Sequence, residues 1–119
     1  MGGVSVDPVV SAVLNALGKR YVVETYQDEK CYYVRYSDGW IEQGGREAFI
    51  AQNPQIIQLP VEMRDTNYPI LLTVNFNPGN LWDWAPYGIP ASTNQIKVFN
   101  DQGAHSDIFF VWRVEGYAA

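Results

Sequence analysis

The chain has 119 residues, of which 47% are hydrophobic and 14% aromatic, and its formal net charge at neutral pH is −5. This length and composition predict one ordered globular domain with a core of its own, and they exclude a disordered chain. The acidic balance, in which Lys19-Arg20 is the only adjacent basic pair, argues against nucleic acid and anionic membranes as partners, because both attract basic surfaces.

Several classes of chemistry find no support in the residue types. Cys31 is the only cysteine and His105 the only histidine, so neither an internal disulfide nor a metal site made of such ligands is predicted. The 13 acidic residues are scattered, and their spacing singles out no pair for general acid–base chemistry. The N-terminus lacks the pattern of a secretory signal, and no segment is apolar enough to span a bilayer. We therefore predict a protein that is not an enzyme and needs no cofactor.

The first predicted element is a short helix that follows a flexible lead-in of residues 1–6. Asp7-Pro8 provides an N-cap and a proline at the first helical position, and Gly18 marks the end. A helix of about three turns is marginal in water, so its apolar stripe must pack either on the domain or on copies of itself. The apolar residues at helical spacing are Val9, Val10, Val13, Leu14 and Leu17.

After the helix the pattern is that of strands, and its clearest part is a β-hairpin centred on Asp38-Gly39. This pair suits a two-residue turn with positive φ at both central positions, which makes Arg35 face Glu42. Because side chains alternate along a strand, one side is predicted to join the core with Tyr32, Val34, Tyr36, Ile41 and Gln43. The other side is aromatic and charged, as suits a protein interface, with Tyr33, Arg35, Trp40 and Glu42.

Alternating or apolar runs predict the remaining strands, over residues 21–26, 56–61, 70–76, 95–99 and 108–114, whereas residues 49–53 fit a strand or a loop. The run 108–114 begins apolar on both faces, which predicts a central strand covered on both sides. About seven strands with short connections are typical of an all-β, antiparallel β-sandwich. The predicted organisation is a lead-in and short N-terminal helix over 1–20 and a sandwich domain over 21–119.

Three motifs, in this order, resemble the C-terminal domains of bacteriophage tail fibres. The hairpin reads SDGWIEQGG over 37–45, DTNY over 65–68 precedes an apolar strand, and FFVWRVEGY over 109–117 is an aromatic strand that ends in Gly-Tyr. The resemblance implies a receptor-binding tip at the end of a fibre, made in the host cytoplasm and carried on the virion. Its implied partners are a bacterial surface glycan or outer-membrane protein and the rest of the fibre or tail, without nucleic acid or membrane insertion.

The resemblance also favours copies of the chain as the partners of the predicted helix, because the helix stands where a fibre shaft would enter the tip. It implies a homotrimer that buries the helix seam and the charged side of the hairpin. Three copies of His105 near the axis could hold a metal, although a polar loop histidine is the favoured interpretation. The candidate interface residues are Val10, Val13, Leu14, Leu17, Tyr33, Arg35, Trp40 and Glu42.

A long segment without a strand pattern is the first candidate for receptor contact. Aromatic rings stack on the C–H face of a sugar while amide and carboxylate groups bind its hydroxyls, and binding residues are often carried on loops. The alternative is that these rings fold inward, because large aromatic side chains are costly to expose. The candidates are Asn77, Asn80, Trp82, Asp83, Trp84 and Tyr87, followed by His105 in a second loop. The resemblance to tail fibres does not extend to this segment and therefore implies no binding residue in it.

Two other functions remain open. The domain could be a trimerisation or assembly cap that registers the shaft without binding a receptor, or a stand-alone lectin-like module that acts as a monomer. Joint substitution of Trp82 and Trp84 distinguishes the assembly cap from a receptor-binding tip, because a cap would keep host adsorption. The solution mass distinguishes the lectin-like module from a trimeric tip, because the module predicts no oligomer.

Overall fold

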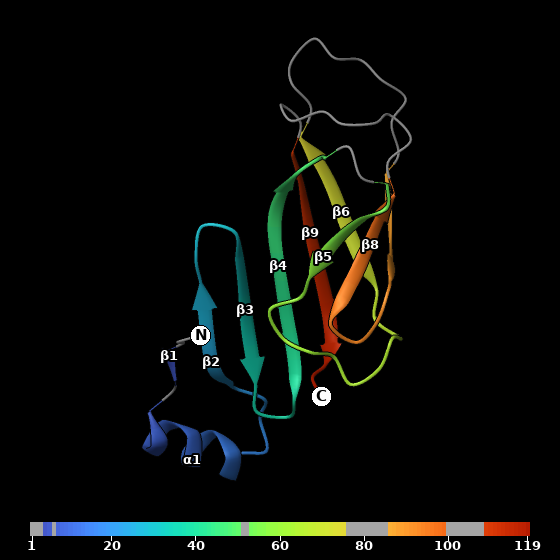
Figure 1. Cartoon of the computed structure of the whole chain (residues 1–119). Coiled ribbons are helices and arrows are strands. Elements are labelled where there is room, and N and C mark those ends of the chain that lie inside the picture. The colour runs from blue at the N-terminus through green and yellow to red at the C-terminus, as the bar shows by residue number, and fades with distance from the viewer. Residues whose placement is uncertain (1–3, 6, 51–52, 76–85, 100–108) are drawn as a thin grey trace.

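The computed structural model describes residues 4–5, 7–50, 53–75, 86–99 and 109–119, which form one helix and nine strands in two antiparallel sheets (Figure 1). The larger sheet has the order β1-β2-β3-β4-β9-β6, with bounds Val4–Ser5, Val22–Gln27, Cys31–Tyr36, Trp40–Ala48, Phe109–Tyr117 and Ile70–Asn75. The smaller has the order β5-β8-β7, with bounds Gln55–Gln58, Gln95–Phe99 and Tyr87–Pro90. The predicted all-β class with one short helix is confirmed.

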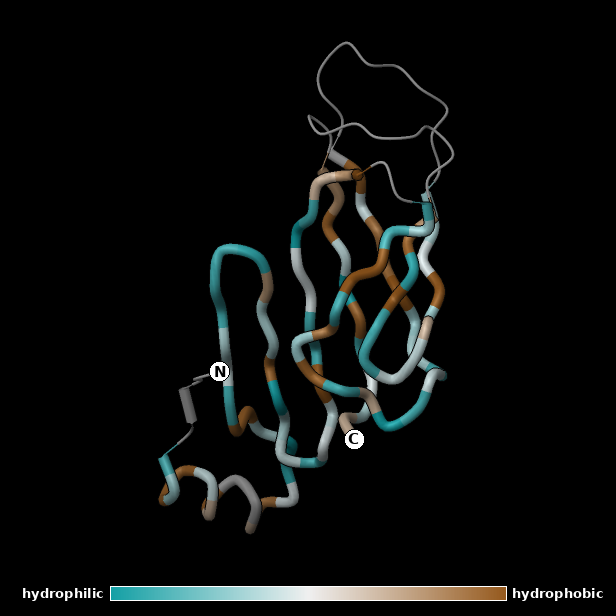
Figure 2. Tube along the Cα trace, in the orientation of Figure 1, coloured by the Kyte–Doolittle hydropathy of each residue, from teal (hydrophilic) through white to brown (hydrophobic). Residues whose placement is uncertain are grey.

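The core lies between the two sheets, where the small sheet covers β4, β9 and β6 (Figures 1 and 2). The rings of Phe49 and Phe110 meet there with centroids 4.7 Å apart. Burial of such side chains contributes about 1.5–3 kcal/mol each, so this cluster supplies most of the stabilisation. Its fully buried apolar members include Ile41, Phe49, Met63, Ile96, Val98, Phe110 and Val114.

Strand β9 is central in the large sheet, as predicted, but it is covered on one side only. Phe110, Trp112 and Val114 are buried, whereas Val111 is 39% exposed and Arg113 is also exposed. In the described part of the chain, the small sheet packs on a single face, so the residues between the core positions point outward. The expectation of a strand buried on both sides is therefore wrong.

The predicted hairpin is formed by β3 and β4, but in a register that differs by one residue. Arg35 pairs with Ile41 instead of Glu42. The amide of Gly39 donates to a carbonyl three residues earlier at 3.1 Å, and Gly39 has a φ of 91° while Asp38 keeps an ordinary negative φ. The connection is therefore a three-residue loop ending in a left-handed glycine, not the two-residue turn that needs two positive φ values.

This shift exchanges the two sides of β3, because a one-residue slip turns every side chain to the opposite face. Ile41 and Gln43 are fully buried, as predicted, but their companions on β3 are Tyr33, which is only 4% exposed, and Arg35. Arg35 pairs with Glu24 at 3.4 Å rather than with Glu42. The side facing away from the core carries Tyr32, Val34, Tyr36, Trp40 and Glu42.

The other strands differ from the predictions at their ends, and two strands were not predicted, namely β7 and β1, which pairs with β2 inside the expected flexible lead-in. The predicted run 56–61 yields only β5, and 49–50 and 53 belong to no strand. Strand β7 was not predicted, because its sequence Tyr-Gly-Ile-Pro contains two residues that are rare in strands. Pro90 is tolerated because β7 lies at an edge of the small sheet.

Helix α1 spans Pro8–Ala16 and begins as predicted, with the Asp7 carboxylate accepting the amide of Val9 at 2.9 Å. It lies beside the sandwich at one end (Figure 1) and, in the described part of the chain, has no extensive contact with any strand. No helix among these residues is long and apolar enough to cross a membrane.

Candidate functional site

The side of the large sheet that faces away from the small sheet, called here the outer face, is covered by no described strand. It is built from alternate residues of β3, β4, β9 and β6. Its aromatic and charged members include Tyr32, Tyr36, Trp40, Glu42, Arg46, Phe109, Arg113, Glu115 and Tyr117. The outer face is therefore both aromatic and charged, as was expected of one side of the hairpin. The residues that β3 contributes to it are Tyr32 and Tyr36 instead of Tyr33 and Arg35.

An ion-pair network orders the middle of the outer face. Arg113 pairs with Glu42 at 3.5 Å and, more closely, with Glu115. Partial burial, together with the neighbouring Glu42 carboxylate, raises the pKa of Tyr36. Each exposed pair contributes little stability, but three charged groups on adjacent strands keep each other in place. The Arg113 charge is thus paired within the chain itself, and the three groups together keep one net negative charge.

A row of alternating cations and rings, called here the Trp40 cluster, crosses the outer face at the end nearest α1. The guanidinium carbon of Arg20 lies 5.4 Å from the centre of the Trp40 ring. Trp40 and Tyr117 meet edge to face with centroids 5.2 Å apart. The guanidinium carbon of Arg64 lies 4.8 Å from the centre of the Tyr117 ring. Each exposed cation–π contact of this kind contributes about 0.5–1 kcal/mol.

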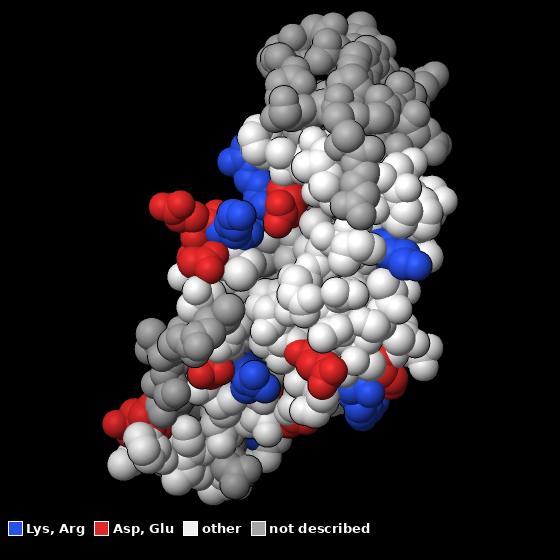
Figure 3. All heavy atoms as spheres, in the orientation of Figure 1, with Lys and Arg blue, Asp and Glu red and all other residues white. Residues whose placement is uncertain are grey.

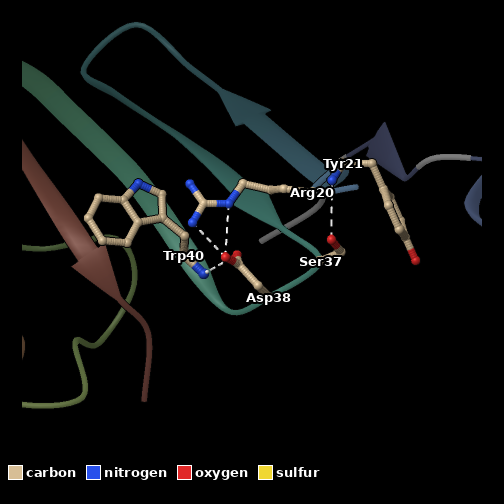
Figure 4. Close-up of polar contacts among 5 residues, drawn as sticks. All are labelled: Arg20, Tyr21, Ser37, Asp38 and Trp40. Carbon is tan, nitrogen blue, oxygen red and sulfur yellow. Dashed lines mark hydrogen bonds and ion pairs between the residues drawn. The ribbon is translucent and has the colours of Figure 1, made fainter. Parts of the chain in front are cut away.

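The hairpin turn holds one end of the Trp40 cluster (Figure 4). The Asp38 carboxylate accepts the amide of Trp40 at 3.1 Å and Nε of Arg20 at 2.8 Å. The Ser37 hydroxyl accepts the amide of Tyr21 at 3.1 Å, which attaches the turn to the chain that leaves α1. Desolvation raises the pKa of Asp38, but the hydrogen bonds from the Trp40 amide and from Arg20 outweigh this effect. The pKa of Asp38 therefore stays below its usual value.

A hollow of about 270 Å³, called here the Tyr117 hollow, opens at the other end of the cluster. Its apolar walls include Trp40, Tyr117 and Pro69. Its polar lining comes from the connection between β5 and β6 and from β9, with Arg64, Asp65, Asn67 and Glu115. Strand pairing brings these segments together, because Trp40 pairs with Tyr117 and the amide of Arg64 donates to the Tyr117 carbonyl at 2.9 Å.

The hollow has no signal in the sequence, although the segments that line it belong to recognisable motifs. The DTNY motif by itself predicts only a turn, and the Gly-Tyr ending predicts only the end of a strand. Residues 40, 64–67 and 115–117 are far apart in the chain, so no spacing rule connects them. The pairing of β4 with β9 and the hydrogen bond from Arg64 to Tyr117 bring them together.

The candidate receptor residues are described only in part. Tyr87 is 54% exposed, and its ring stacks on Phe99 with centroids 5.0 Å apart. Asn75 pairs with Phe109, so the strand ends that flank the two candidate loops lie at the end of the domain opposite α1 (Figure 1). The remaining candidates lie outside the described residues, namely Asn77, Asn80, Trp82, Asp83, Trp84 and His105.

The candidate interface residues do not form one surface. Val10 and Val13 are exposed along α1, and Leu17 is exposed directly after its last residue. Leu14 belongs to the same helix, but its side chain lies outside the described part. Tyr33 and Arg35 lie on the inner side of the large sheet, whereas Trp40 and Glu42 lie on the outer face, so the expected common hairpin side is corrected. Contact of any of them with another copy stays a prediction.

The charges that the structure describes form no broad patch of one sign on the face shown in Figure 3, where acidic and basic side chains lie next to one another. Several are ion pairs, including Arg20 with Asp38 at 2.6 Å. Among the described residues, no three His, Cys, Asp or Glu side chains are grouped so that they could hold a metal ion. On this face the described charges are thus mixed and form no basic patch of the kind that a polyanion requires.

No family model and no curated protein matches the chain. Two solved structures share its fold. An N-truncated R2-type pyocin tail fibre has a TM-score of 0.59 and 17% identity over 98% of this chain and 48% of that chain. A C-terminal part of the Pseudomonas aeruginosa R2 pyocin fibre has a TM-score of 0.55 and 16% identity over 98% of this chain and 33% of that chain. This chain therefore spans about half or less of those fibres, and it has a tail-fibre-like fold.

Proposed function

We propose that the protein is the tip of a phage-type tail fibre, which forms a homotrimer and adheres to a bacterial surface receptor. The tail-fibre-like fold, shared over 98% of the chain, supports the fibre part of this function. The observation that carries the trimer is the apolar stripe of α1, which is exposed in the single chain.

A helix of this kind needs a partner. Helix α1 has nine residues, and isolated helices shorter than about 12–15 residues are marginal in water. The exposed fraction of its valines runs from 49% for Val10 to 72% for Val9. Val10, Val13 and Leu17 are spaced by three and four residues, as at the a and d positions of a coiled coil. Burying each would contribute about 1.5–3 kcal/mol per subunit, which favours a helical seam between copies.

Receptor binding would then rely on repetition. In a trimer joined through α1, three copies of the opposite end, marked by the exposed Tyr87, are available at once. Linked sites bind with an avidity that exceeds the affinity of one site by orders of magnitude, about 10²–10⁴-fold. Weak contacts to a repeated surface structure, such as a glycan, are therefore sufficient for adhesion.

Light scattering on a size-exclusion column tests the trimer. We expect three times the chain mass of 13.5 kDa for the parent chain and the monomer mass for Val13→Asp, which places a charge in the seam. Ala12→Asp is the matched control, because it adds the same charge to the same helix away from the stripe and should leave the trimer intact. A parent chain that is monomeric at micromolar concentration would contradict the trimer.

Binding of the labelled trimer to host cells tests adhesion. We expect binding by the parent and a loss with Tyr87→Ala or with joint substitution of Trp82 and Trp84. Circular dichroism and solution mass confirm that each variant is folded and trimeric. Unchanged adsorption by all variants of a trimeric chain would favour the assembly cap, whose receptor contacts lie elsewhere in the fibre.

A further inference from the structure

We propose that the Tyr117 hollow binds one neutral sugar unit of a surface glycan, as a second site separate from the Tyr87 end. The inference rests on the proposed function for the source of the sugar, since the receptor of a fibre tip supplies it. The site itself is argued from the walls, the polar groups and the rigidity of the hollow.

The size and the apolar walls fit a single sugar ring. Small-molecule pockets usually enclose about 300–1,000 Å³, and this hollow, with about 270 Å³, is slightly smaller than that range. Tyr117 is 37% exposed, and Trp40 meets it edge to face. Pro69 adds an apolar surface beside them. Beside the Tyr117 face over which Arg64 lies, these walls offer apolar surface to the C–H groups of one pyranose ring.

The polar lining offers donors and acceptors in balance. Arg64 is a donor, Asp65 an acceptor, and the Asn67 side-chain amide is both. The Arg64 and Asp65 side chains are 62% and 49% exposed, and they lie 3.7 Å apart, too far for a strong hydrogen bond between them. Both therefore keep bonding capacity for a ligand that has hydroxyl groups.

The mixture of charges selects against ionic ligands. Asp65 repels an anion and Arg64 repels a cation, while Glu115 is already paired with Arg113. A sugar hydroxyl can donate to a carboxylate and accept from a guanidinium or an amide, so a neutral polyhydroxy compound matches all the groups at once. The chemistry of the lining thus indicates an uncharged sugar rather than a phosphate, an acidic sugar or an amine.

The hollow is ordered before any ligand arrives. Asp65 accepts the amide of Asn67 at 2.9 Å, which fixes the turn that carries both side chains. The Tyr68 hydroxyl donates to backbone carbonyls of Ser92 and Gln95 at 2.6 and 3.0 Å, so its ring stays buried behind the hollow. A site that is rigid in the free protein loses little conformational entropy on binding.

Titration of the ¹⁵N-labelled chain with free sugars, followed by amide NMR, tests the proposal. The probes are a hexose, an N-acetylhexosamine, a 6-deoxyhexose and, as charged comparisons, a uronic acid and acetate. We expect at least one neutral sugar to shift the amide signals of Asn67, Gly116 and Tyr117. Asn67→Ala should weaken binding about fivefold, the loss of one hydrogen bond of about 1 kcal/mol.

Thr66→Ala is the matched control, because Thr66 belongs to the same turn and does not line the hollow. It should bind like the parent. The proposal is overturned if no neutral sugar shifts these signals, if the uronic acid or acetate alone does, or if Asn67→Ala and the parent bind equally. Cell adsorption distinguishes this proposal from the proposed function. A chain that adsorbs to cells but binds no sugar at the hollow would contradict only the sugar site. A trimer that fails to adsorb would contradict the proposed function.

Discussion

The two faces of the large sheet are made by the same strands and have opposite characters. On β9, Phe110, Trp112 and Val114 point inward and are buried, while Val111 and Arg113 between them point outward. Along β4, β9 and β6 the small sheet covers the inner face. The outer face brings rings and ion pairs to the surface. The period of two in a β-strand thus allows one strand to build both the core and the candidate binding surface.

The two faces should differ most in the free energy of unfolding that is lost when the side chains of neighbouring β9 residues are truncated to alanine. Phe110→Ala removes a fully buried ring that contacts Phe49, and we expect it to lower the free energy of unfolding by about 3–5 kcal/mol. Val111→Ala, the matched change on the outer face, should cost less than about 1 kcal/mol. Urea unfolding measures both. Similar losses would mean that the outer face is as closely packed as the core.

The inner face has a polar exception in Gln43, which is fully buried. Its side-chain amide donates to the Val61 carbonyl and accepts the Val61 amide, both at 2.9 Å. We expect Gln43→Leu to lower the free energy of unfolding by about 1–3 kcal/mol, because the backbone groups of Val61 lose their partners. Gln27→Leu is the control at an exposed glutamine and should be close to neutral. A stabilised Gln43→Leu chain would show that the segment around Val61 finds other partners.

The comparison of faces also shows what could be predicted from the sequence. Alternation along 95–99 and 109–114 is strong enough to define strands, and the Asp7 cap fixes the start of α1. The register of the hairpin could not be predicted, because Asp38-Gly39 fits both a two-residue turn and the three-residue loop that ends at Gly39. That choice alone decided which side of β3 is buried.

The candidate site was less predictable than the fold, for a related reason. Loop composition drew attention to residues 77–87, where one aromatic residue, Tyr87, is described and exposed. The Tyr117 hollow depends instead on contacts between segments distant in the chain, such as Arg64 with Tyr117. Single-sequence patterns report local periodicity and turn chemistry, so tertiary contacts of this kind leave no signal in them.

The smallest expected effect concerns the part of the large sheet that the small sheet leaves uncovered. The turn between β2 and β3 depends on Asp28, which accepts the amides of Lys30 and Cys31, each at 2.8 Å. The Tyr26 hydroxyl also donates to this carboxylate at 2.8 Å. The two amides, followed by the hydroxyl, lower the pKa of Asp28 from 3.8 to about 2.

Because the pKa of Asp28 is lower in the folded than in the unfolded chain, its carboxylate stabilises the fold above pH 4 and loses this effect as the pH falls toward about 2. Asp28→Asn should therefore reduce the difference between the melting temperatures at pH 7 and pH 3. Glu29→Gln, an exposed change in the same turn, should leave that difference unaltered. If both variants keep the difference of the parent, the acid sensitivity arises elsewhere, and the uncovered strands do not depend on this turn for stability.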